Sequence, residues 1–151
     1  MNTTSDLEKV QKLVLDIVMI ERDHNIPGSD RHENVVEHSM AVTMLCWKMY
    51  NQFEPDLDLE KVLKYSLVHD YLERGLKKDV NTYADASAKE QKKKQEALEL
   101  ARLKDDFSDF SSMVGAIQQY EMMSDEESKF VWSIDKMQAM ILGSIDNWRP
   151  Y

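Results

Sequence analysis

Apolar residues recur every three or four positions over most of the chain, the spacing that places side chains on one face of an α-helix. The first such row follows a capping box at residues 5–8 and predicts a helix that runs to about Arg22. Residues 23–33 contain Pro27 and Gly28, which favour turns, so we expect a loop there.

Further helices are expected along the rest of the chain. Asn34 is placed to cap one that ends before Pro55, and Asp58 to cap the next, whose apolar row leads to Asp70. The remaining segments are predicted as a loop at 75–86, a highly charged helix at 87–104, a shorter helix at 110–122, and a helix from a capping box at 124–127 to residue 145. The pattern predicts an all-α bundle of about five to seven helices.

The composition agrees with helices throughout. Only 4 Gly and 3 Pro interrupt 151 residues rich in side chains that lose little freedom in a helix. Domains commonly run to roughly 100–150 residues, so we assign residues 1–151 to a single domain. Cys46 is the only cysteine, which excludes a disulfide framework and favours a small core residue.

The charge limits the partners of the protein. A formal net charge of −9, without any basic block, would repel long DNA or RNA. A small phosphorylated molecule remains open, because a metal ion and local cations can overcome the global field. No stretch approaches the ~20 apolar residues that span a bilayer, and the polar start lacks the apolar core of a signal peptide. We therefore expect a cytoplasmic protein without a membrane partner.

Four residues are candidates for chemistry: His38, His69, Asp70 and Asp135. Either histidine alone would more often be a hydrogen-bonded core residue. The two aspartates, however, interrupt apolar rows, and a buried carboxylate is costly unless it is paired, hydrogen-bonded or bound to metal. Two imidazoles and two carboxylates on three helices suit one divalent manganese, iron, cobalt, nickel or zinc ion better than a calcium cage.

Residues 31–39, 67–73 and 130–136 resemble the three signature segments of HD-domain metal-dependent phosphohydrolases. The similarity is closest to the branch of bacterial 5′-deoxynucleotidases and their eukaryotic relatives. The order His, His-Asp, Asp in these segments is the metal motif of that superfamily. The resemblance implies an HD-type helical bundle, a divalent metal ion at the four candidate residues, and hydrolysis of a nucleoside phosphate.

The resemblance also implies roles outside the metal motif. Arg22 matches an arginine that holds the substrate phosphate, and Arg31 is a second candidate for offsetting phosphoryl charge. Glu73 matches an acid proposed to handle the water or the leaving group. Asp79 matches a second candidate acid, although Lys78 stands where relatives usually have Gly. From the residues alone, Arg22 could equally be a helix C-terminal cation and Glu73 a solvated carboxylate.

Two features limit what the resemblance carries over. Many relatives follow the phosphate-binding arginine with a Trp that can stack on a base, whereas here Asp23 follows Arg22, so base selectivity is not inherited. The charged run at residues 89–94 is interpreted as a solvated helix face rather than a phosphate site.

The favoured function is hydrolysis of a 5′-deoxynucleoside monophosphate by metal-activated water. A triphosphohydrolase that acts on a dNTP such as dATP is the alternative enzyme, and guanosine tetraphosphate hydrolysis ranks below both. A non-catalytic nucleotide-binding module is the alternative from another class. The expected partner is a small-molecule nucleotide. A homodimer is also expected, as the family's dimers imply, with Trp47, Trp132 and Trp148 as candidates for its surface.

Overall fold

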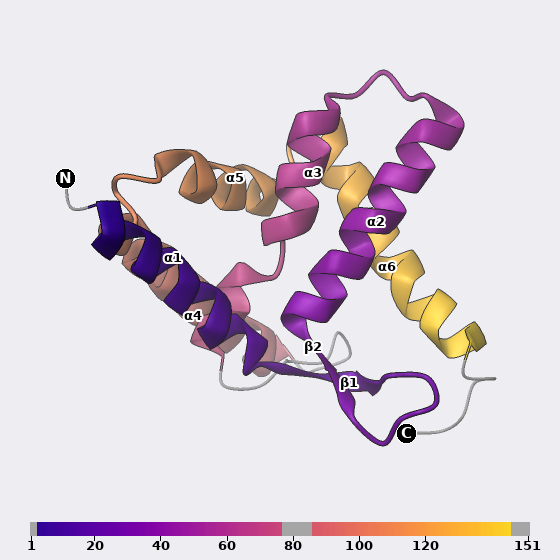
Figure 1. Cartoon of the computed structure of the whole chain (residues 1–151), viewed down its shortest axis with the longest axis horizontal. Coiled ribbons are helices and arrows are strands. Elements are labelled where there is room, and N and C mark those ends of the chain that lie inside the picture. Colours follow the sequence, from indigo (N-terminus) through magenta and orange to yellow (C-terminus); the bar gives the residue numbers. More distant parts are fainter. Residues whose placement is uncertain (1–2, 77–85, 146–151) are drawn as a thin grey trace.

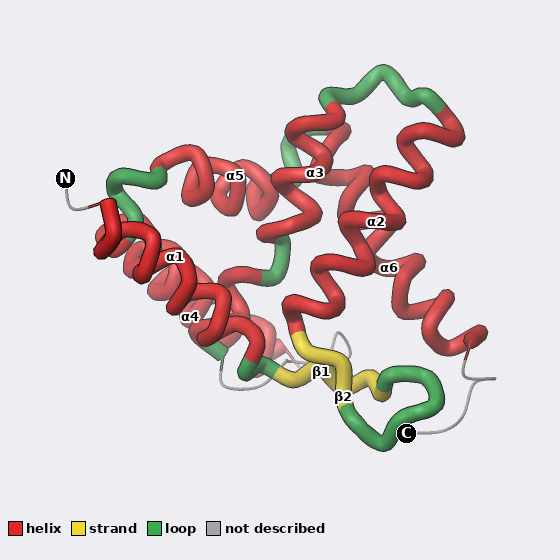
Figure 2. The backbone as a smooth tube through the Cα atoms, viewed as in Figure 1, coloured by secondary structure: helices red, strands yellow, loops and turns green. Residues whose placement is uncertain are grey.

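The computed structural model describes residues 3–76 and 86–145. Within these ranges the chain is mostly helical, with a small β-hairpin near the N-terminal third (Figure 1, Figure 2). The elements are α1 Thr3–Val18, β1 Glu21–Asn25, β2 His32–Asn34, α2 Val35–Phe53, α3 Leu59–Val68, the 3₁₀ helix η1 Tyr71–Gly75, α4 Ala86–Asp106, α5 Ser111–Met122 and α6 Glu126–Ile145. The six α-helices of the described ranges lie within the number predicted for the bundle.

Helix α3 lies at the centre of the bundle and packs against α2, α5 and α6 (Figure 1). The 3₁₀ helix η1, which follows α3, contacts both α1 and α4. The core includes Val42, Val62 and Val131, all completely buried. Cys46 is buried with them, as predicted for a small core residue. None of the described helices is long and apolar enough to cross a membrane.

The predicted caps of α2 and α3 are confirmed. The Asn34 side chain accepts a hydrogen bond from the Glu37 backbone N–H, and the Glu37 carboxylate accepts one from the Asn34 N–H, both at 3.0 Å. This reciprocal pair satisfies two backbone donors at the start of α2. The Asp58 carboxylate likewise accepts from the Lys61 N–H at the start of α3.

The prediction of a helix to Arg22 followed by a loop is wrong. Helix α1 ends at Val18, and Arg22 lies on strand β1, which pairs antiparallel with β2. Between the strands, Gly28 has a φ of +79°, which favours glycine, and the Ser29 N–H donates to the Ile26 carbonyl at 2.9 Å. The strands escaped prediction because their residues are mostly polar and lack the alternation that marks a strand.

The third helix ends earlier than its apolar row suggests. Helix α3 stops at Val68, and Asp70 has φ −104° and ψ 13°, outside the α-helical range. A 3₁₀ helix then carries Glu73, whose N–H donates to the Asp70 carbonyl at 3.0 Å. Glu73 therefore does not share a helix with His69, although its spacing of four residues from His69 indicates one helix face.

Helix α4 is better packed than its charged sequence indicates. Leu103 is completely buried and Glu99 is only 2% exposed. The Glu99 carboxylate lies 3.4 Å from Arg74 Nε, and a Cβ on Gly75 would come within 3.1 Å of the Glu99 Cβ. Glycine thus permits the close approach of α4 to η1, which carries Glu73.

The cap of α6 is Asp125, not the predicted capping box at residues 124–127. Asp125 Oδ1 accepts from the Ser128 N–H at 2.8 Å, whereas Oδ2 accepts from the Tyr65 hydroxyl at 2.9 Å. Lys61 Nζ is 3.0 Å from the same Oδ2. Asp125 therefore joins the start of α6, which carries Asp135, to α3, whose end is followed by His69 and Asp70.

We predict that Asp125→Ala lowers the free energy of unfolding by about 1–2 kcal/mol, because it removes an N-cap. Ser124→Ala is the matched control and should change stability by less than about 0.5 kcal/mol. Burial raises the pKa of Asp125, but hydrogen bonds from Ser128, Lys61 and Tyr65 outweigh it and lower the pKa to about 2. The contribution is therefore present above the ordinary Asp pKa and is lost as the pH falls towards 2. Urea unfolding of both variants between pH 2 and pH 7 checks this; equal losses in the two variants would contradict it.

Candidate metal centre

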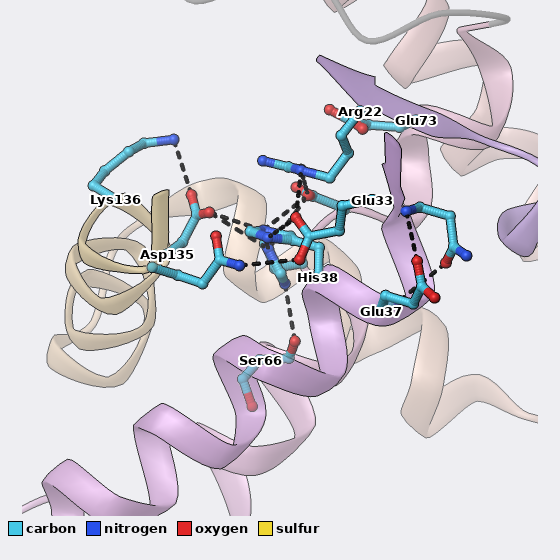
Figure 3. Close-up of polar contacts among 12 residues, drawn as sticks. Arg22, Glu33, Glu37, His38, Ser66, Glu73, Asp135 and Lys136 are labelled. Carbon is cyan, nitrogen blue, oxygen red and sulfur yellow. Dashed lines mark hydrogen bonds and ion pairs between the residues drawn. The ribbon is translucent and has the colours of Figure 1, made fainter. Parts of the chain in front are cut away.

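Four predicted ligands converge from three parts of the fold, and two of them, His38 and Asp135, are labelled in Figure 3. His38 lies on α2, His69 and Asp70 follow the end of α3, and Asp135 lies on α6. His38 Nε2 is 3.2 Å from His69 Nε2, 3.0 Å from Asp135 Oδ1 and 3.5 Å from Asp70 Oδ2. His69 Nε2 is 3.4 Å from Asp70 Oδ2 and 3.9 Å from Asp135 Oδ1.

These separations fit donors that share one ion. Metal–ligand distances of about 2.0–2.2 Å place neighbouring donors roughly 3–4 Å apart in tetrahedral or octahedral geometry. Suitable atoms of His38, His69 and Asp135 all lie within 4.8 Å of one another, and all three residues are buried. The chemistry of the set, imidazole nitrogens with carboxylate oxygens, suits a divalent transition metal.

Both imidazoles turn the same nitrogen towards the centre. His69 Nδ1 is 2.9 Å from the Ser66 carbonyl oxygen, which can only accept a hydrogen bond, so Nδ1 carries the proton (Figure 3). Nε2 is therefore the nitrogen of His69 that can offer a lone pair to an ion in the cluster. His38 Nδ1 faces Glu33 Oε2 at 3.5 Å, which leaves His38 Nε2 in the matching position.

The electrostatics of the cluster favour a cation. Burial lowers the pKa of His38, but Asp135 and Glu33 outweigh burial and raise the pKa to about 9. Burial raises the pKa of Asp135, yet the hydrogen bond with His38 and the charge of His69 bring it well below its ordinary range. A divalent ion bound here would displace a proton from His38, because a histidine ligand must be deprotonated.

Sequence reasoning missed Glu33, which supports His38 from behind. Glu33 is 5% exposed, and its Oε1 accepts a hydrogen bond from Gln138 Nε2 at 3.0 Å. Its Oε2 lies near both His38 Nδ1 and Arg22 Nε, the latter at 3.7 Å. A carboxylate behind a metal-binding histidine fixes the ring and raises its basicity. No pattern in the sequence marked this residue, since it lay in a segment predicted as loop.

Arg22 reaches the cluster from strand β1. Its Nη1 donates to Asp70 Oδ2 at 2.6 Å, and its side chain is only 12% exposed. The interpretation of Arg22 as a helix C-terminal cation is therefore wrong. Its proposed contact with a substrate phosphate stays a prediction, and the pair with Asp70 shows that its charge lies beside the candidate ligands.

Glu73 is buried, not solvated, and lies close to Lys92 of α4. It is 5% exposed, and Lys92 Nζ donates to Glu73 Oε1 at 3.2 Å. Lys92 belongs to the charged run that was interpreted as a solvated face, and that interpretation is wrong for this residue. The lysine is not distinguishable from its neighbours in the sequence, and only the packing of α4 on η1 brings it to Glu73.

A cleft of about 240 Å³ opens beside the cluster. His69, Asp70 and Asp135 form part of its wall, and Lys92 and Lys136 bring positive charge to it. Lys136 Nζ is 2.9 Å from Asp135 Oδ2 (Figure 3). The wall also carries Glu73, Glu96 and Glu121, and Lys92 pairs with Glu73 and Glu96. Carboxylates therefore outnumber the two lysines in the wall, so an anionic ligand would depend on a bound divalent ion as well as on these cations.

Two other predicted residues are not brought to this cluster by the described structure. The Arg31 guanidinium forms two 2.8 Å hydrogen bonds with the Glu37 carboxylate and is exposed. A contact with phosphate would require that pair to open, so the role of Arg31 stays a prediction. Asp79 lies outside the described residues.

The sequence matches the family model described as "HD domain" over residues 20–149. The match covers most of the chain. The protein belongs to the HD domain family. No curated protein matches the sequence.

Solved structures show the same HD-type fold. A predicted metal-dependent phosphohydrolase from Magnetospirillum magnetotacticum MS-1 aligns with a TM-score of 0.78 at 20% identity, over 96% of this chain and 74% of that chain. A conserved hypothetical protein from Pyrococcus furiosus gives 0.66 at 21% identity, over 93% and 82%. The PH0347 protein from Pyrococcus horikoshii OT3 gives 0.61 at 21% identity, over 95% and 99%. At these identities the likeness establishes the fold of this HD protein.

We predict that Asp135→Ala lowers the bound metal and any metal-dependent activity together, because it removes a ligand while leaving the helices in place. Exposed Asp105→Ala is the control and should keep both. Elemental analysis of the purified variants measures the bound metal, and circular dichroism checks that the helical fold is kept. An Asp135→Ala protein with stoichiometric metal and full turnover would show that the four-ligand assignment is wrong.

We also predict that Glu33→Gln weakens metal binding about 10- to 100-fold, the usual effect of changing a residue that contacts and orients a metal ligand. Glu37→Gln is the matched control, since Glu37 pairs with Arg31 outside the cluster and glutamine preserves the capping box. Competition titrations against a chelator measure both affinities. Equal affinities for the two variants would exclude a role for Glu33 in orienting His38.

Proposed function

We propose that this HD protein is a metal-dependent phosphohydrolase that cleaves a nucleoside 5′-monophosphate, with a deoxynucleotide as the first substrate to test. The observation that carries the proposal is the buried set of two imidazoles and two carboxylates beside a cleft that also holds two lysines. Such a set leaves positions open for water and phosphate. The similar Magnetospirillum protein, a predicted metal-dependent phosphohydrolase, agrees in reaction class, and the motif resemblance supplies the nucleotide.

The residues around the cluster have distinct tasks in this proposal. When bound by His38, His69, Asp70 and Asp135, a divalent ion supplies a Lewis acid that polarises phosphate and activates water. Arg22, held by Asp70, stabilises the charge of the phosphoryl oxygens. Lys92 and Lys136 offset part of the carboxylate charge in the cleft wall, which favours entry of the anionic substrate once the ion is bound.

Glu73 is assigned the proton transfer. In the reaction a water oxygen bonds to phosphorus as the P–O5′ bond breaks, and the nucleoside leaves with a proton on O5′. Glu73 lies in the cleft wall and is close enough to Lys92 for its carboxylate to be held in place. It accepts the proton of the attacking water and returns one to the leaving oxygen.

A substrate panel tests the function directly. The metal-loaded protein is incubated with nucleoside mono-, di- and triphosphates under several divalent metals, and phosphate release and product chromatography are recorded. The proposal expects inorganic phosphate and a nucleoside from a monophosphate. Release of tripolyphosphate would identify a dNTP triphosphohydrolase instead, and tight nucleotide binding without turnover would identify a non-catalytic nucleotide-binding module.

We predict that Glu73→Gln lowers kcat by about 10²–10⁴ while metal and nucleotide binding are retained, because the amide keeps the shape and loses the proton carrier. Glu90→Gln is the control, since Glu90 is an exposed acid of α4 that pairs with Lys94. It should leave kcat within about threefold. Steady-state kinetics on the metal-loaded proteins measure both. An unchanged kcat in Glu73→Gln with metal bound would move the proton role to Asp79, which Asp79→Asn then tests.

A further inference from the structure

Trp132 places an exposed indole in the wall of the candidate active-site cleft. Trp132 is 47% exposed. It lines the same cleft as His69, Asp70 and Asp135. Trp132 lies three residues before Asp135 on α6, and residues at this separation share one face of a helix. The indole is thus one helical turn from a proposed metal ligand.

The exposure of Trp132 does not by itself indicate a binding surface. Large apolar side chains are scattered over the surfaces of many proteins, and Trp47 on α2 has the same exposed fraction of 47%. Trp47 does not line the cleft beside the metal cluster. The difference between the two residues is their position, so Trp47 provides a matched control for Trp132.

Lys136 connects the indole with the metal cluster. Its Nζ is 5.8 Å from the centroid of the Trp132 ring. The same Nζ is 2.9 Å from Asp135 Oδ2 (Figure 3). Lys136 therefore contacts both the Trp132 ring and the candidate ligand Asp135. The ring and this ligand are thus close enough for one mononucleotide to reach both. A phosphate at the cluster would leave the other end of the same molecule beside the indole face.

The cleft is sized for a small ligand. Its volume of about 240 Å³ is below the roughly 300–1,000 Å³ of typical pockets for drug-sized molecules, which excludes a long polymer as the enclosed ligand. An indole face stacks well on a nucleobase, because every base has a flat π surface. Lys136, whose Nζ lies over the Trp132 ring, adds a cation beside the proposed stacking surface.

We propose that Trp132 is the surface on which the nucleobase of the substrate stacks. The inference rests on the proposed function, since it assigns a base-binding residue to the same site. Stacking tolerates all bases, so Trp132 selects for the presence of a base and discriminates little between bases. Nucleoside monophosphates are thereby favoured over sugar phosphates that lack a ring.

Binding of a hydrolysis-resistant probe tests the assignment independently of turnover. The probe is the phosphonate analogue of deoxyadenosine 5′-monophosphate, and its Kd is measured by calorimetry with the metal-loaded full chain. Trp132→Ala should raise the Kd at least about fivefold, the lower end of the loss expected for one stacked base. Trp132→Phe should stay within about threefold of the wild type, because phenylalanine keeps an aromatic face. Trp47→Ala should leave the Kd unchanged.

The baseless probe 2-deoxyribose 5-phosphate completes the experiment and should show the same Kd for the wild type and Trp132→Ala. Equal affinities of these two proteins for the phosphonate nucleotide would overturn the inference, as would the absence of binding to the wild type. A change confined to sedimentation behaviour would assign the indole to self-association and overturn it as well. Trp132-dependent binding without hydrolysis of any nucleotide would support the inference and remove the proposed function.

Discussion

His38 on α2 and Asp135 on α6 are 97 residues apart in the sequence, yet His38 Nε2 lies 3.0 Å from Asp135 Oδ1. This hydrogen bond joins α2 to α6. Both residues are buried, and a buried ionised group is costly unless its charge is balanced and its hydrogen bonds are satisfied. The surrounding residues balance these charges, although His38 Nδ1 and Glu33 Oε2 lie 3.5 Å apart and form no hydrogen bond in the described structure. Glu33 faces the other nitrogen of His38, Lys136 contacts the second oxygen of Asp135, and Arg22 balances Asp70. The cluster thus constrains the packing of α2, α3 and α6.

The end of α3 has a specific role in this arrangement. Consecutive residues of an α-helix point about 100° apart, since the helix has 3.6 residues per turn. His69 and Asp70 nevertheless face the same centre, because the helix stops at Val68 and Asp70 adopts a non-helical backbone. The following 3₁₀ helix then directs Glu73 into the cleft wall. The common orientation of His69 and Asp70 towards the cluster therefore depends on the end of α3 at Val68.

Sequence patterns predicted the parts of the site that interrupt helical rows. Asp135 was found because a carboxylate in an apolar row requires a partner, and the order of the motif added the two histidines. The early end of α3 was not signalled, because the apolar row continues to Leu72, which is buried in the structure. Most helices were predicted correctly for the same reason, since burial of an amphipathic face determines them.

The supporting residues could not be predicted, because their roles arise from contacts between distant segments. Glu33 is buried by a hairpin whose strands lack an alternating pattern. Lys92 stands among lysines of equal appearance, and only the approach of α4 to η1 at Gly75 distinguishes it. Arg22 was recognised through the motif resemblance, yet its strand, and hence its contact with Asp70, was not.

The central claim is that two imidazoles and two carboxylates from three segments bind one ion. X-ray absorption spectroscopy of the metal-loaded protein measures the donors directly. The account predicts nitrogen and oxygen donors at about 2.0–2.2 Å, with the outer-shell scattering of two imidazole rings per ion. A spectrum with oxygen donors alone, and no imidazole scattering, would contradict it.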